Sequence, residues 1–187
     1  GFIGYGNGST GTVNINSGTW TNSLNMRVGY YGNGTLNLAG GNITNVNGII
    51  GKYGASNSVA NVSGGTWTST GYLTIGDEAT GTLNLTGGNV AVASGSGNVT
   101  IGLETTSSGT LNLGTGTTVG TLQAARVTGG NGTAVVNINH TGNYTFAPIL
   151  TGSLSLNKLG NGTTTLSANN TYTGATTISA GTVSYTH

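Results

Sequence analysis

The chain alternates apolar and polar residues over short stretches that end in glycine, asparagine or serine. Thr82-Leu83-Asn84-Leu85 is a clear example, because its leucines alternate with polar residues and Thr86-Gly87-Gly88 follows. Alternation with period two over about four to eight residues is typical of a half-buried β-strand. Helical spacing appears nowhere over a useful length, and each interior glycine costs a helix about 1 kcal/mol. The pattern therefore predicts an all-β protein of short strands joined by turns.

Three short motifs recur along the chain with the same period, and the first of them recurs at gaps of 22–26 residues. The first is an Ile-Gly or Val-Gly pair, the second is an apolar-Asn-apolar triplet, and the third is a glycine turn followed by one large apolar residue. The first motif occurs at Ile3-Gly4, Val28-Gly29, Ile50-Gly51, Ile75-Gly76 and Ile101-Gly102. A fixed spacing of about 20–50 residues is the sequence signature of a stacked-repeat architecture.

A strand of four or five residues cannot satisfy its own backbone hydrogen bonds, so it must pair with another strand. If each repeat forms one coil, each strand lies beside its counterpart in the next repeat, parallel to it and about 4.8 Å away. Crossover connections between parallel strands are right-handed in almost all proteins. The sequence therefore predicts a right-handed parallel β-helix with about three short strands in each 22–26-residue coil.

The central asparagine of the second motif is predicted to face outward, because the apolar residues on either side of it face the core. Stacking the coils in register places six asparagines in one column on the surface. Side-chain amides in such a column can hydrogen-bond along the stack, as they do in cross-β ladders. The expected structural ladder consists of Asn14, Asn37, Asn61, Asn84, Asn112 and Asn137.

The composition excludes several classes of function. Charged residues make up only 4% of the 187 residues, against about 25% in ordinary soluble domains. Nucleic-acid binding needs clustered Lys and Arg, and the four cations of this chain are scattered, so we expect no nucleic-acid partner. The chain has no cysteine, and it lacks the long apolar run of about 18 residues that a membrane-spanning helix needs.

The last part of the chain, residues 156–183, carries a different and specific motif. It runs Lys158, Gly160-Asn161-Gly162-Thr163, an alternating strand to Leu166, Asn170-Thr171-Tyr172-Thr173-Gly174, Thr177-Ile178 and Ala180-Gly181-Thr182. This stretch resembles the autotransporter-associated β-strand repeat. It departs from the pattern at Thr165, where the family often has Leu, and at Ala175, which replaces a second Gly.

The resemblance implies a secreted bacterial surface protein of the type V pathway, with this chain as part of its passenger domain. Its expected partner for export is an outer-membrane translocator barrel, which is not in this chain. In this family the repeat is linked to export of the passenger and not to catalysis. The repeat residues singled out on this basis are Lys158, Gly160, Gly162, Asn170, Tyr172, Gly174 and Gly181.

The expected organisation is one β-helix over residues 1–187 that forms a fragment of a longer passenger, since the chain begins inside a repeat. Residues 1–119 keep a regular period, residues 120–155 form looser coils in which Pro148 appears, and residues 156–183 form the family repeat.

Four tyrosines follow the Ile-Gly or Val-Gly motif and are expected to cluster on one edge of the rod: Tyr5, Tyr30, Tyr31 and Tyr53. Exposed aromatic rings beside amides and hydroxyls are a common way of holding sugars. These residues are the predicted ligand-binding surface. The competing interpretation is that the rings only cover the backbone of the turns.

Catalytic and metal sites are not predicted. Stacking places Lys52 beside Asp77 and Glu78 beside Glu104, a spacing that resembles the carboxylate pair of a retaining glycosidase. The repeats place no third acid, Arg or His near the two glutamates, so a solvated turn with an ion pair is the favoured interpretation. His140 is the only non-terminal histidine and lies too far along the rod from Asp77 to form a catalytic triad. No zinc set or calcium repeat can be assembled, and no cofactor is expected.

The sequence therefore predicts a non-catalytic passenger segment at the bacterial cell surface, acting as an adhesive surface or a structural stalk. A host-surface or glycan receptor is the expected partner of an adhesive segment. Two alternatives remain open. The first is a self-assembling extracellular fibre subunit that associates end to end through unpaired strand edges. The second is a polysaccharide lyase or hydrolase built on a β-helix.

Overall fold

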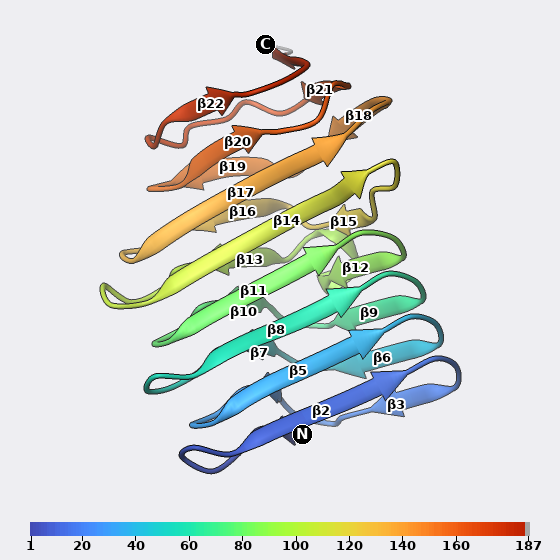
Figure 1. Ribbon diagram of the computed structural model, residues 1–187, viewed down its shortest axis with the longest axis vertical. Helices are drawn as coiled ribbons and strands as arrows, with labels where there is room; N and C mark the ends of the chain where they lie inside the picture. Colours follow the sequence, from blue (N-terminus) through green and yellow to red (C-terminus); the bar gives the residue numbers. More distant parts are fainter. Residues whose placement is uncertain (186–187) are drawn as a thin grey trace.

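The computed structural model describes residues 1–185, so His187 lies outside the described residues. In this part the chain forms a β-solenoid of about eight coils of about 23 residues, and its paired strands run parallel. In Figure 1 the front strands run from left to right and the chain returns behind them while it climbs, which makes the solenoid right-handed. The predicted parallel β-helix is confirmed.

The strands form three faces, and the third face is divided into two sheets. Sheet A consists of β1 (Phe2–Ile3), β4 (Met26–Val28), β7 (Gly48–Ile50), β10 (Leu73–Ile75), β13 (Asn98–Ile101), β16 (Arg126–Gly129) and β19 (Ile149–Gly152). Sheet B consists of β2 (Thr10–Ile15), β5 (Asn33–Leu38), β8 (Asn57–Val62), β11 (Thr80–Leu85), β14 (Ser108–Gly116), β17 (Thr133–His140), β20 (Ser155–Lys158) and β22 (Thr176–Ile178).

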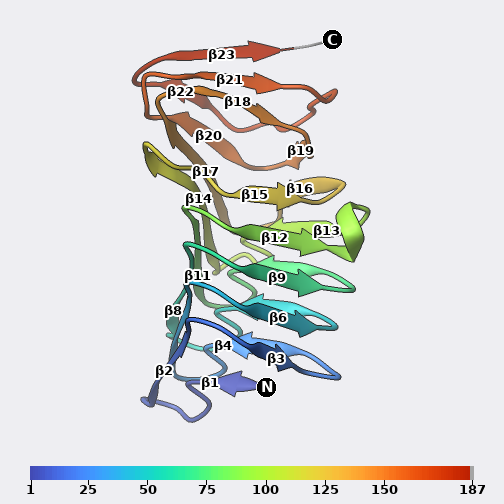
Figure 2. The ribbon, with the colours of Figure 1, turned by 90° about the vertical axis from the view of Figure 1, so that its right-hand side faces the viewer.

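The third face follows sheet B in each coil, and its strands are stacked one above the other in Figure 2. Sheet C consists of β3 (Thr19–Thr21), β6 (Asn42–Asn45), β9 (Thr66–Ser69), β12 (Asn89–Val92) and β15 (Thr121–Gln123). Sheet D consists of β18 (Asn143–Phe146), β21 (Thr163–Leu166) and β23 (Thr182–Tyr185). A short 3₁₀ turn, η1 (Ala93–Gly95), links β12 to β13. The break between β15 and β18 falls within residues 120–155, the stretch expected to be looser.

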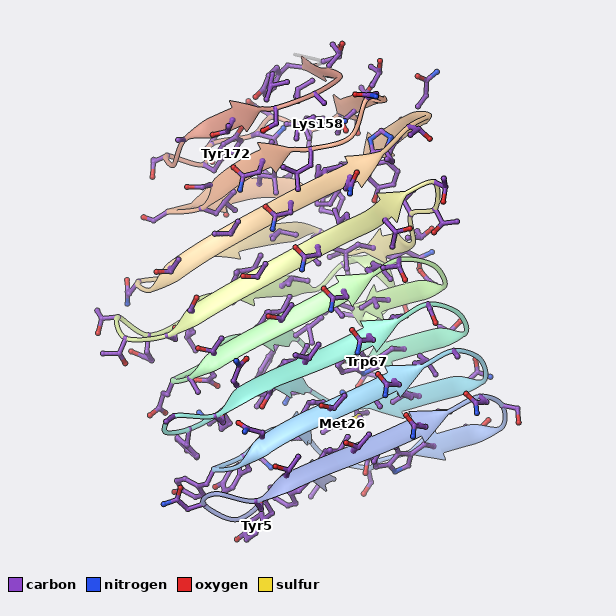
Figure 3. The ribbon with its side chains drawn as sticks, in the orientation of Figure 1. Tyr5, Met26, Trp67, Lys158 and Tyr172 are labelled. Atoms are coloured by element: carbon purple, nitrogen blue, oxygen red, sulfur yellow. The ribbon has the colours of Figure 1, made fainter. Side chains whose placement is uncertain are left out.

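The core is a set of apolar columns that run the length of the rod, because equivalent residues pair in register. Leu83 lies opposite Leu111 in one neighbouring coil and opposite Ala60 in the other. All three side chains are completely buried. The small side chain of Ala60 is in the same coil as Trp67, whose indole is also completely buried and points into the solenoid (Figure 3).

The coil that contains Trp67 has a polar contact inside the core. Trp67 Nε1 donates a hydrogen bond of 2.6 Å to Asn45 Oδ1, and Asn45 Nδ2 donates one of 3.0 Å to Ser69 Oγ. Asn45 and Ser69 are each 1% exposed. A buried polar group without a partner would destabilise the fold, and these two hydrogen bonds satisfy the polar groups that Trp67 and Asn45 bring into the core.

Glycine is required where sheet A turns into sheet B. Gly76 has φ of +73°, a left-handed conformation that other residues adopt only with strain. A Cβ atom at this position would also collide with the carbonyl oxygen of Ser108 in the next coil. The recurring Ile-Gly pair is therefore a consequence of close stacking at this corner.

In the part of the chain that the structure describes, no helix has the length and apolar character needed to cross a lipid bilayer.

Candidate functional site

The six predicted ladder asparagines form one continuous column on the outer face of sheet B. Each amide Nδ2 donates to Oδ1 of the preceding asparagine, over 2.7 Å between Asn37 and Asn14 and 2.8 Å between Asn61 and Asn37. The next three bonds, as far as Asn137, are each 2.7 Å. Sequence reasoning missed a seventh member, Asn157, which donates to Asn137 over 2.9 Å. The Leu156-Asn157 pair carries the signal, but Lys158 follows it where the other triplets have an apolar residue.

The structure brings the four predicted tyrosines together at the corner between sheets A and B, near the start of the chain. The Tyr5 and Tyr30 rings stack at 5.3 Å with an angle of 6° between their planes, and the Tyr31 and Tyr53 rings stack at 5.1 Å and 23°. Tyr30 connects the two pairs through edge contacts with Tyr31 and Tyr53. Phe2 also joins this tyrosine corner, with its ring 5.0 Å from Tyr5.

Two cations lie over the rings of the tyrosine corner. The Arg27 guanidinium is 5.1 Å from the Phe2 ring and 5.4 Å from the Tyr30 ring, and Lys52 Nζ is 4.4 Å from the Tyr53 ring. These distances are typical of cation–π contacts. The corner is therefore packed by its own rings and cations, yet Tyr5 and Tyr31 remain 60% and 47% exposed.

Lys52 is also the centre of a small charge network. Its Nζ lies 3.0 Å from Asp77 Oδ2 and 3.4 Å from Glu78 Oε1. Burial alone would lower the pKa of Lys52, but the hydrogen bond and the charge of Asp77 have a larger combined effect, so the pKa of Lys52 is raised. Asp77 lies beside Lys52 in the neighbouring coil, as the repeat alignment predicts, since Asp77 N donates to Gly51 O.

The two glutamates also align in neighbouring coils, since Glu78 N bonds to Lys52 O and Glu104 N bonds to Asp77 O. Lys52 contacts Glu78, so this carboxylate already has a cationic partner. Among residues 1–185 no group of three or more His, Cys, Asp or Glu side chains is close enough to hold a metal ion.

The most deeply buried ionisable groups lie in the last coils, at His140 and Lys158. His140 is 3% exposed; its Nε2 lies 2.7 Å from Thr164 Oγ1 and its Nδ1 lies 2.9 Å from Gly142 O. Burial lowers the pKa of His140 and the nearby charge of Lys158 lowers it further, while the Gly142 carbonyl acts in the opposite direction.

Lys158 pairs with Ile138 in an interior column, so its side chain enters the core and is completely buried (Figure 3). Its ammonium donates to the Gly160 carbonyl, and burial lowers the pKa of Lys158.

The glycines of the family repeat lie where the backbone of the preceding coil comes closest. An added Cβ would collide with the His140 carbonyl at Gly160 and with the Leu154 carbonyl at Gly174. Gly162 and Gly181 are equally restricted by backbone atoms of neighbouring coils, and Gly181 has φ of +72°.

Asn170 and Tyr172 belong to a segment that runs along β19 without forming a regular strand. Asn170 Oδ1 accepts a hydrogen bond of 2.7 Å from Leu150 N, and the backbone of Thr171 bonds to Leu150 O. The hydroxyl of Tyr172 lies 2.6 Å from Thr176 Oγ1 and 3.0 Å from the hydroxyl of Tyr185. The Asn-Thr-Tyr-Thr-Gly motif thus covers the outer edge of β19 with backbone and side-chain hydrogen bonds.

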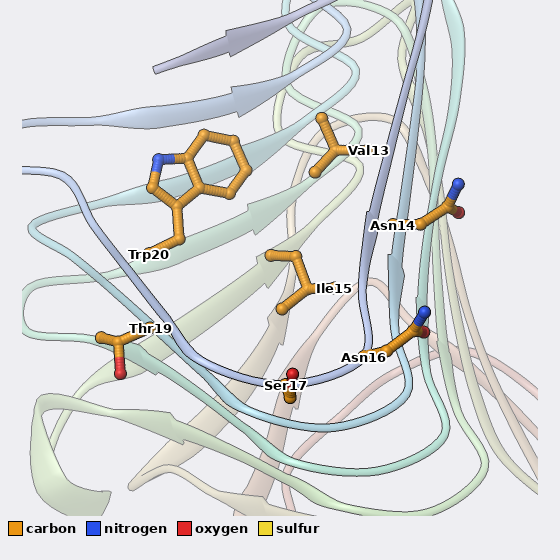
Figure 4. Close-up of a pocket in the computed structure, with 7 residues that line it drawn as sticks. All are labelled: Val13, Asn14, Ile15, Asn16, Ser17, Thr19 and Trp20. Atoms are coloured by element: carbon orange, nitrogen blue, oxygen red, sulfur yellow. The ribbon is translucent and has the colours of Figure 1, made fainter.

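The opposite end of the rod exposes the interior of the first coil. A hollow of about 320 Å³ lies there, and Val13, Ile15 and Trp20 face it (Figure 4). These side chains are in register with Leu36, Leu38 and Ile43 of the next coil, which are completely buried. The hollow is therefore the uncovered end of the core columns.

Comparison with family models matches residues 156–184 to the passenger-associated-transport-repeat. No curated protein and no solved structure matches the chain. The matched repeat, together with the β-solenoid, fits an autotransporter passenger domain, and this confirms the resemblance found in the sequence.

Proposed function

We propose that this chain is a non-catalytic stalk segment of a bacterial surface protein, exported across the outer membrane through a translocator barrel, and that it carries an adhesive contact at its tyrosine corner. The observation that carries the stalk is the continuous parallel pairing of the eight strands of sheet B, from β2 to β22. Each coil contacts only its neighbours, so stability grows with the number of stacked coils, as in other repeat proteins.

The tyrosine corner is the best candidate for the adhesive contact, because it combines exposed rings with fixed geometry. Mutual stacking holds Tyr31 in place, yet its side chain stays 47% exposed. Aromatic rings that are already ordered lose little conformational entropy when they bind a ligand. Neighbouring cations and acids add polar groups at the edge of this surface.

A binding screen on immobilised glycans and host-cell surfaces tests the adhesive contact. Tyr31→Ala is expected to weaken binding by about tenfold or more, as for a centrally placed aromatic contact. Tyr72→Ala is the matched control, because Tyr72 is similarly exposed at 44% but lies outside the cluster. Equal binding by the two variants would remove the adhesive role and leave the stalk.

Cleavage assays on the purified chain test the absence of catalysis. Glu78→Gln and Glu104→Gln are expected to leave the protein unchanged in every polysaccharide-cleavage assay, because Lys52 already pairs with Glu78. Turnover by the native chain that either substitution abolishes would instead support the lyase or hydrolase alternative.

The fibre subunit remains a second candidate, because the apolar surface at the first coil can contact the end of a second copy as well as a further coil of the same chain. Val13, Ile15 and Trp20 offer apolar surface, and β2 is the end strand of sheet B, so its outer edge is unpaired among the described residues. Light scattering over a dilution series is expected to show concentration-dependent growth that Trp20→Ser reduces. A constant monomer mass at all concentrations would exclude this role.

A further inference from the structure

A second concave surface lies on the outer face of sheet B, away from the tyrosine corner. It is a groove of about 380 Å³ that follows the asparagine ladder across β8, β11, β14 and β17. The tyrosine corner precedes the strands of sheet B, whereas this groove lies towards their far ends. The residues that line it are Asn61, Asn84, Thr86, Asn112, Gly114, Thr115, Asn137, Asn139 and Leu159.

One wall of the groove comes from an enlarged corner after β14. The step from sheet B to sheet C is four residues longer here than in the preceding coil, which brings Thr115 beside the ladder. Gly114 and Gly116 both have positive φ, at +85° and +104°, and β14 shows a bulge between Leu113 and Gly116.

The same corner is held by its own hydrogen bonds. Thr115 N donates to Thr118 O over 2.9 Å, and the hydroxyls of these two threonines lie 3.2 Å apart. The wall is therefore formed before any ligand arrives, which lowers the entropy cost of binding.

The floor of the groove is a regular array of amides. A side-chain amide has two N–H donors and an oxygen with two lone pairs, and the ladder uses one donor and one lone pair of each inner asparagine. One donor and one acceptor per coil therefore remain for a ligand, repeated about every 4.8 Å along the rod. Leu159, which is 43% exposed, adds an apolar side chain to this array.

We propose that this groove binds a neutral, unbranched polysaccharide strand that runs parallel to the rod axis. A sugar hydroxyl is both donor and acceptor, so it matches an amide that offers one of each. The groove has no charged lining residue, so it offers nothing to attract an anionic polymer. An extended peptide fits less well, because the backbone groups on this face already pair within sheet B and cannot extend a ladder.

Isothermal titration calorimetry with hexasaccharides tests the proposal on the full chain. The probes are the β-1,3- and β-1,4-linked glucose hexamers as neutral ligands and a hexagalacturonate as the anionic one. At least one neutral hexamer is expected to bind saturably, and more tightly than the hexagalacturonate. The double substitution Thr115→Ala, Leu159→Ala is expected to weaken that binding by about five- to tenfold, as for one hydrogen bond and one apolar contact.

The controls use matched residues outside the groove. Thr117→Ala alters the same corner, and Leu24→Ala removes a leucine that is 73% exposed. Both are expected to bind as the native chain does. No saturable binding of either neutral hexamer, a preference for the hexagalacturonate, or equal affinity of the double variant and the native chain would overturn the proposal. Binding that is lost only in Tyr31→Ala would also overturn it and would locate the sugar at the tyrosine corner instead.

Discussion

Replacing Trp67 by phenylalanine tests the polar contact inside the core. The change removes the 2.6 Å hydrogen bond to Asn45 Oδ1 and leaves that oxygen unpaired at 1% exposure. A buried acceptor without a partner costs about 1–3 kcal/mol, and the apolar atoms lost with the smaller ring add about 1–2 kcal/mol. The free energy of unfolding is therefore expected to fall by about 2–5 kcal/mol.

Trp20→Phe provides the matched control for this prediction. Trp20 occupies the same interior column, in register with Ile43 and then Trp67, but its ring is only partly buried. Its side chain makes no hydrogen bond within residues 1–185, so the cost is expected to stay below about 1 kcal/mol. Urea unfolding followed by circular dichroism, with a second probe to test two-state behaviour, measures both.

A double-mutant cycle separates the hydrogen bond from the lost volume. Asn45→Val alone leaves the Trp67 indole N–H unpaired, whereas combining it with Trp67→Phe removes both partners. The double variant is expected to lose less than the sum of the single losses by about 1 kcal/mol or more. Additive losses, or equal costs of Trp20→Phe and Trp67→Phe, would show that the buried hydrogen bond between Trp67 and Asn45 does not stabilise the fold.

Three further predictions concern the backbone, the ladder and pH. Gly8 has φ of +71° and nothing lies within 4 Å of an added Cβ, so Gly8→Ala is expected to lower the free energy of unfolding in urea by about 1–2 kcal/mol. Gly76→Ala is expected to cost more, because its Cβ also collides with the neighbouring coil. Equal costs of the two variants would contradict the close stacking of the coils. Asn84→Ala removes two hydrogen bonds of the asparagine ladder and is expected to lower the free energy of unfolding by about 1–3 kcal/mol. Asn14→Ala removes one such bond at the exposed end of the ladder and is expected to cost about 1 kcal/mol or less. Thermal melting of the two variants measures the difference. The pKa of His140 is lowered in the fold, so the unfolded chain takes up a proton at a higher pH than the folded chain does. The contribution of His140 to the free energy of unfolding is therefore expected to be fully present above about pH 6.5 and to be lost as the pH falls from there through the folded pKa. Melting temperatures that depend on pH equally in His140→Gln and in the native chain would contradict this.

The register of the fold was readable from the sequence because each repeat carries its own marker of position. The Asn-centred triplet sets which residues face out, and the Ile-Gly pair sets where the corner turns. Parallel stacking of identical motifs then leaves little freedom, since a slip of one residue would turn every leucine outward. Asn84 and Leu83 therefore lie as the pattern predicts.

The contacts between different columns were not readable in the same way. Phe2 joins the tyrosine corner through edge contacts with Tyr5 and Tyr30, and these contacts depend on where neighbouring coils place their side chains. The hydrogen bond between Trp67 and Asn45 joins two neighbouring coils inside the core, and no repeated motif in the sequence indicates it. The groove beside the ladder arises from one enlarged corner at Thr115, an insertion whose direction depends on its own backbone conformation.

Distances between spin labels test most directly whether the coils stack in parallel register. The chain has no cysteine, so labels can be placed on introduced cysteines at Thr12, Thr82 and Thr110, which lie in one outward column of sheet B. Parallel stacking in register predicts that double electron–electron resonance gives about 14 Å for the Thr12–Thr82 pair and about 19 Å for the Thr12–Thr110 pair, a difference of one strand spacing. Equal distances for the two pairs, or a shorter distance for the second, would contradict it.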